Sequence, residues 1–132
     1  MIHLDTSVVI DALTGPRRSQ PRLRQLIQEG ERLLLNSLVV FEWRRGARTS
    51  DEIEDQEALF PASDSIPFGS PEALAAADLY RRINRPRGRE IDIAIAACAI
   101  VHHAQLWTLN PDDFKDIPNL KLLPAISARS SA

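Results

Sequence analysis

Four acidic residues stand where short apolar segments end or where helices are expected to begin: Asp5, Glu42, Asp92 and Asp113. Carboxylates that converge without an interleaved lysine or histidine repel one another. A hard divalent cation such as Mg²⁺ or Mn²⁺, which prefers oxygen ligands, relieves that repulsion. Such an ion activates water and neutralises charge on a phosphodiester, so the four acids favour phosphodiester hydrolysis.

Each of these acids also has a purely structural explanation. A carboxylate at the start of a helix commonly caps free backbone N–H groups and interacts favourably with the helix dipole. A non-catalytic α/β interaction module, whose acids only cap helices, is therefore an alternative to an enzyme. Such a module would bind no metal, and the two hypotheses differ in that respect.

Neutral polar residues accompany the acids in the same segments. We expect them to hydrogen-bond a carboxylate, a metal-bound water or a phosphate oxygen. These residues are Thr6, Ser7, Thr108 and Asn110. Two further acids lie close by. Asp112 is an alternative to Asp113, and Glu90 is either a ligand to a metal-bound water or a charge at the start of a helix.

Arginine supplies most of the positive charge. Of the 16 basic residues only Lys115 and Lys121 are lysines, which leaves 14 arginines, and the net charge of −2 excludes a polycation that binds nucleic acid by bulk attraction. Local clusters still suit phosphate, because residues 81–89 contain five arginines and no acid and lie shortly before Asp92. One interpretation is solvated helix ends; the other is contact with RNA phosphates by Arg85, Arg87, Arg89 and Arg44.

The elements that must position these residues alternate between short apolar strands and helices. Strands are expected at 2–4, 33–35, 65–68, 106–109 and 120–123, and helices before 15, at 22–31, from 36 to 46, at 51–60, 70–84 and 93–101. This order predicts the α/β class, with a mainly parallel sheet of four to five strands and helices on both faces. Right-handed crossovers then bring all four acids to one edge of the sheet, with Glu42 early in its helix.

Length and composition limit the remaining possibilities. The 132 residues suit one domain, at 1–124, followed by a polar tail at 125–132 that we expect to be disordered. A single cysteine, Cys98, suits a reducing compartment, and we expect a cytoplasmic protein. The longest apolar run, 93–101, is too short to span a membrane. Five acids between 51 and 57 are interpreted as a solvated helix face.

Four ordered motifs together resemble a PIN domain, specifically the VapC-type toxins of bacterial and archaeal toxin–antitoxin pairs. They are Asp5-Thr6-Ser7 after an apolar strand, Glu42-Trp43-Arg44-Arg45-Gly46, the segment from Asp92 to Ala99, and the segment from Thr108 to Phe114. The resemblance runs from Ile2 to about Leu123. It implies a Mg²⁺- or Mn²⁺-dependent endoribonuclease whose site is Asp5, Glu42, Asp92 and Asp113. It also implies a homodimer held inactive by a small cognate antitoxin, in a heterotetramer or a larger assembly.

Another function class gathers acids at the edge of a parallel sheet. A receiver-like phospho-acceptor normally has paired acids at the end of its first strand and a lysine after a late strand. Here Asp5 stands alone at that strand end, and Lys115 follows Asp113. The five glycines are isolated from one another, which excludes a phosphate-binding glycine loop.

Overall fold

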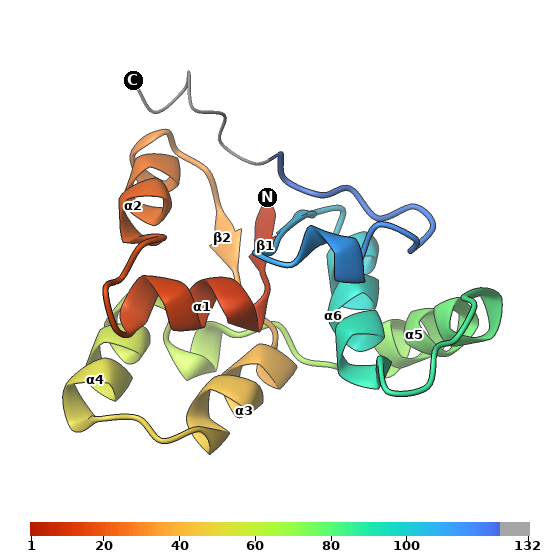
Figure 1. Cartoon of the computed structure of the whole chain (residues 1–132), viewed down its shortest axis with the longest axis horizontal. Coiled ribbons are helices and arrows are strands. Elements are labelled where there is room, and N and C mark those ends of the chain that lie inside the picture. Colours follow the sequence, from red (N-terminus) through yellow and green to blue (C-terminus); the bar gives the residue numbers. More distant parts are fainter. Residues whose placement is uncertain (125–132) are drawn as a thin grey trace.

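A three-stranded parallel sheet forms the centre of the computed structural model, which describes residues 1–124 (Figure 1). The strands are β1 (Ile2–Leu4), β2 (Leu33–Leu34) and β3 (Gln105–Trp107), in the order β2-β1-β3. Ile2 pairs with both Leu33 and Gln105, and every residue of β1 is buried. Because all three strands run the same way, the residues that follow them meet at one edge of the sheet.

Two segments predicted as strands make only one bridge each. Ile66 pairs with Asn36 beside β2, and Leu122 pairs with Leu106 beside β3, both in the parallel sense. Ile66 N donates to Leu35 O and Ser37 N donates to Ile66 O, and the first ladder ends there because α3 begins at Ser37; in the second, Leu106 N donates to Lys121 O and Leu123 N donates to Leu106 O. The sheet therefore has three strands rather than the expected four to five, although both added segments lie along its edges.

Six α-helices surround the sheet in the described part of the chain. They are α1 (Thr6–Leu13), α2 (Gln20–Gln28), α3 (Ser37–Arg45), α4 (Ser50–Leu59), α5 (Ser70–Arg82) and α6 (Glu90–Val101). Two short 3₁₀ turns follow α4 and β3, at Ala62–Asp64 and Pro111–Asp113. The predicted α/β class is confirmed, and each predicted helix exists with ends shifted by a few residues.

Helix α6 anchors the packing on one side of the sheet. Its residues 93–99 are all buried, as their uninterrupted apolar character predicts. Four alanines in that run let neighbouring backbones approach closely, and α6 packs along α5 and against α3 and β3. Helix α1 contacts α2, α3 and α4 (Figure 1). The starts of α1 and α6 are thereby fixed relative to the sheet.

None of the helices within residues 1–124 is long and apolar enough to cross a membrane. The predicted tail at 125–132 lies outside the described residues.

Candidate active site

Asp5 joins β1 directly to α1 and is only 5% exposed. It occupies the capping position of α1, yet its side chain makes no capping hydrogen bond. Instead its Oδ2 accepts hydrogen bonds from the hydroxyls of Ser7 and Thr108, each at 2.8 Å. Helix capping therefore does not explain this buried carboxylate, and its partners come from the residues that follow β1 and β3.

The two hydroxyls that hold Asp5 are themselves fixed by backbone groups. Leu109 N donates to Ser7 Oγ at 3.1 Å, and Asn110 N donates to Thr108 Oγ1 at 3.0 Å. Each hydroxyl then turns its own proton toward Asp5. Ser7 and Thr108 thus hydrogen-bond a carboxylate through their side chains, as expected. Asn110 takes part through its backbone N–H and not through its side chain.

Glu42 approaches the same edge from α3. Thr6 donates its hydroxyl to Glu42 Oε1 at 2.6 Å, and an Arg45 nitrogen lies 3.5 Å from Oε2. The prediction that Glu42 lies early in its helix is wrong, because α3 begins at Ser37. Five residues at about 1.5 Å each put Glu42 about 7.5 Å along α3, where it meets the first residue of α1.

Asp92 shows that the acids share one electrostatic environment. It is half-buried in the first turn of α6, a helix whose capping residue makes no side-chain cap. The pKa of Asp92 is raised to about 6, mainly by burial and then by the negative charges of Asp5, Asp113 and Glu42 in that order of size, against the opposing charge of Arg89. The topology has therefore brought all four predicted acids within electrostatic reach.

The two neighbouring acids after β3, Asp112 and Asp113, have different surroundings. Asp113 contributes to the raised pKa of Asp92. The side chain of Asp112 is 89% exposed and its Oδ1 lies 3.4 Å from Lys115 Nζ. This geometry favours Asp113 as the fourth acid.

Glu90 has a local structural role. It is exposed, and it accepts a hydrogen bond from Gly88 N at 2.9 Å, the main cause of its lowered pKa. These contacts match the interpretation of Glu90 as a charge at the start of a helix.

Arg89 braces the turn that carries Asp113. Its guanidinium donates to both carboxylate oxygens of Asp116, at 2.6 and 2.9 Å, and to the backbone oxygen of Asp113 at 3.0 Å. The hydrogen bonds to Asp116 are the main reason that the pKa of Arg89 is raised. Nothing in the sequence separates Asp116 from other surface acids, so this pairing was not anticipated.

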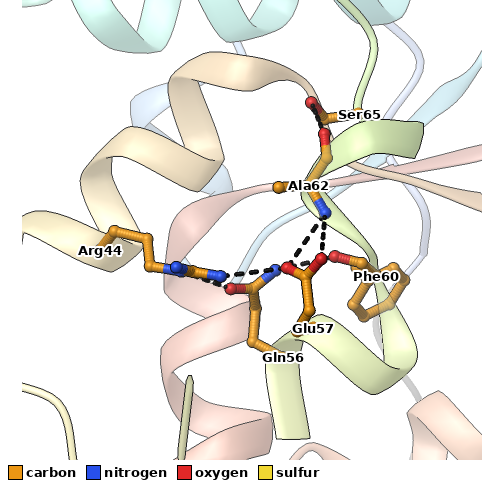
Figure 2. A network of polar contacts seen from close by, with 6 residues as sticks. All are labelled: Arg44, Gln56, Glu57, Phe60, Ala62 and Ser65. Carbon is orange, nitrogen blue, oxygen red and sulfur yellow. Dashed lines mark hydrogen bonds and ion pairs between the residues drawn. The ribbon is translucent and has the colours of Figure 1, made fainter. Parts of the chain in front are cut away.

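The other arginines of the predicted RNA contact divide into paired and unpaired groups. Arg44 donates to Gln56 and Glu57 of α4, at 2.8 and 3.0 Å (Figure 2). Arg85 and Arg87 are exposed and form no ion pair with any residue between 1 and 124. Two of the four arginines are therefore free to meet a phosphate without first losing a partner.

The donor atoms at this edge suit a hard divalent cation, because the four acids offer only oxygen. No group of three or more His, Cys, Asp or Glu side chains within residues 1–124 is arranged to hold a metal ion as it stands. Asp5 is nonetheless fixed through one oxygen only, and its Oδ1 accepts no hydrogen bond from a described residue. The oxygen-only chemistry of the donor set thus suits Mg²⁺ or Mn²⁺.

The PIN domain family model matches residues 2–120. The chain belongs to the PIN domain family. It is 33% identical over 125 residues to ribonuclease VapC19 of Mycobacterium tuberculosis, a match that covers 89% of this chain and 95% of that protein. The resemblance seen in the four motifs is confirmed. Membership of the PIN domain family excludes the receiver-like alternative.

Solved structures show the same fold. A chain of VapBC2 from Rickettsia felis, bound to a DNA fragment from its promoter, has a TM-score of 0.72 at 23% identity, covering 96% of this PIN domain chain and 100% of that chain. A chain of a toxin–antitoxin complex from Klebsiella pneumoniae has a TM-score of 0.69 at 23% identity, with the same coverage.

Proposed function

We propose that this PIN domain chain is a metal-dependent endoribonuclease that hydrolyses RNA phosphodiester bonds. The observation that carries the proposal is the convergence of Asp5, Glu42, Asp92 and Asp113 from four separate segments, where burial and the charges of the other three acids raise the pKa of Asp92. Carboxylates that share one environment repel one another and lower the stability of the fold, so such a cluster is a candidate functional site. The 33% identity to a protein described as a ribonuclease supports RNA as the substrate.

Asp5, Glu42, Asp92 and Asp113 would hold the metal, with Mg²⁺ as the ion and Mn²⁺ as a substitute. When bound, the ion supplies activation of water and neutralisation of charge at the phosphodiester. The chain's own residues prepare this arrangement. Ser7 and Thr108 orient Asp5, Thr6 orients Glu42, and Arg89 holds the turn of Asp113. Arg85 and Arg87 are the exposed cations that would meet RNA phosphates.

The proposed role is that of the toxin in a type II toxin–antitoxin pair. The solved structures with this fold include VapBC and other toxin–antitoxin complexes. A small cognate antitoxin would hold the nuclease inactive in a heterotetramer or larger assembly built on a homodimer. A short reading frame for a DNA-binding protein immediately upstream of the gene would identify that partner.

Replacement of the acids tests the nuclease. Asp5→Asn, Glu42→Gln, Asp92→Asn and Asp113→Asn should each lower cleavage of a fluorescent RNA by about 100-fold or more in Mg²⁺, with an unchanged circular dichroism spectrum. Asp55→Asn is the matched control, because Asp55 pairs with Arg17 at 2.9 Å away from the site. Full activity in Asp5→Asn would refute the assignment. Absence of both cleavage and metal affinity in the wild type would favour the non-catalytic interaction module.

A further inference from the structure

A groove of about 600 Å³ opens beside the carboxylate edge. It lies where the first turn of α2 and the residues before it, the segment from the end of β3 to Pro111, and the segment 122–124 meet. Thr108 and Leu109 belong both to this groove and to the candidate active site. The Thr108 hydroxyl donates to Asp5, and Leu109 N donates to Ser7. A ligand in the groove would therefore lie next to the proposed cleavage point.

The charged side chains of the groove lining are both arginines. Arg18 and Arg22 line it without an acid, and neither forms an ion pair with a carboxylate in the described chain. Arg22 donates to the backbone oxygen of Pro124 at 2.9 Å, while its buried Nε has no acceptor. Burial lowers the pKa of Arg22, and the charge of Glu29 offsets this only in part. The groove thus offers positive charge that lacks an anion.

The remaining walls of the groove are largely apolar. Leu109 is 44% exposed, and Pro111 and Leu122 lie beside it. The Arg22 guanidinium sits over the Trp107 ring, 5.7 Å from its centroid, which orients the cation. Cations next to exposed apolar surface match a ligand in which a negative group and a flat apolar group alternate. A nucleotide has this composition, and the position of the groove beside the carboxylate edge favours a nucleic-acid strand over an acidic peptide.

We propose that this groove binds the RNA strand adjacent to the phosphodiester that the carboxylate edge cleaves. Arg18 and Arg22 hold a phosphate, and a base rests against Leu109 and Leu122. This inference depends on the proposed function, since it assigns part of the nuclease's substrate to a second surface. It also separates strand positioning, which these arginines perform, from the chemistry of the four acids.

Binding is measured without cleavage, by fluorescence anisotropy of a labelled single-stranded RNA of about ten nucleotides in EDTA. The double variant with Arg18→Gln and Arg22→Gln should raise Kd about tenfold and flatten the dependence of log K on log salt by ~0.7 for each lost phosphate contact. Arg18→Glu should weaken binding similarly, and Arg18 is exposed, so its replacement spares the fold. Leu109→Ala should raise Kd without changing the salt slope.

The matched control is Arg24→Gln, an exposed arginine on the same helix that does not line the groove. It should leave both Kd and salt slope at the wild-type values. In Mg²⁺ the double variant should show a raised KM and a kcat within about twofold of the wild type, because the reacting groups are unchanged.

Three other outcomes would each overturn a different part of the proposal. RNA binding and KM unchanged in both Arg18→Glu and the double variant would overturn the groove and leave the nuclease intact. A wild type that binds RNA through the groove but never cleaves it would overturn the proposed function alone. Competition by polyglutamate as strong as that by unlabelled RNA of equal charge would assign the groove to an acidic protein segment and overturn the RNA proposal.

Discussion

Two acidic regions of this chain differ in what surrounds their carboxylates. Helix α4 has five acids within residues 51–57, and the sheet edge has four acids from four separate segments. On α4, Glu52 completes a capping box with Thr49, Asp55 pairs with Arg17, and Glu57 pairs with Arg44 and accepts from Ala62 N (Figure 2). Three of the five α4 acids therefore have a structural partner.

The carboxylates at the sheet edge have fewer charged partners than those of α4. Within residues 1–124, the carboxylate of Asp5 accepts hydrogen bonds from hydroxyl groups only, and Asp92 forms no ion pair. Glu42 has a hydroxyl partner at 2.6 Å and a more distant arginine at 3.5 Å. The density of acids along the sequence is thus a poor guide to a site. The informative feature is negative charge that converges from separate segments and is not fully balanced by nearby cations, as the raised pKa of Asp92 indicates.

The largest expected contrast between the two regions is their response to metal. Mn²⁺ at about 100 times its Kd should stabilise the wild type by about 2.7 kcal/mol, because the ion binds the folded chain and not the unfolded one. Asp92→Asn should lose most of this gain, while Asp55→Asn on α4 should retain it. Melting curves in EDTA and in Mn²⁺ measure the difference. A wild type whose melting temperature does not change in Mn²⁺ would show that neither region binds the ion and would refute the metal site.

A smaller contrast concerns stability without metal. The pKa of Asp92 is about 6 in the folded chain, against about 3.9 when unfolded. Between these values the folded state retains a proton that the unfolded state has released. Metal-free stability should therefore fall as pH rises from about 4 to about 6 and stay lower at pH 7.

Asp92→Asn removes this penalty and should melt higher than the wild type in EDTA at pH 7. The gain should be ~1 kcal/mol after a discount for solvent screening at this half-buried group. Thermal melts in EDTA at pH 4 and pH 7 would test the sign, since the advantage should shrink at pH 4. A mutant that melts lower than the wild type at pH 7 would instead identify Asp92 as a structural group whose loss costs stability.

Much of this arrangement was predictable because local patterns determine it. The apolar strand before Asp5 and the continuous apolar run after Asp92 predicted a parallel sheet and a buried helix, and the topology then brought the acids together. The prediction that Glu42 lies early in its helix was wrong, because the motif gives the order of the acids but not their depth within a helix. Helix α3 begins at Ser37, where Asn36 accepts from Val39 N, so Glu42 lies five residues into it. The contact between Arg89 and Asp116 could not be predicted, because the two residues are 27 positions apart in the sequence and meet only in the folded chain.

The smallest predicted effect separates the arginines of the two regions. Arg44 is already held by Gln56 and Glu57, so Arg44→Gln should cost ~0.2–1 kcal/mol of stability, the range of an exposed ion pair, and should leave the salt dependence of RNA binding unchanged. Arg87→Gln should do the opposite, with an unchanged melting temperature and a salt slope lowered by ~0.7, because exposed Arg87 has no partner to lose in the described chain. Melting curves and anisotropy titrations at several salt concentrations give both values for each variant. A lowered salt slope in Arg44→Gln would mean that RNA displaces Glu57 from this arginine, and the acids of α4 would then act as a competitor for the substrate.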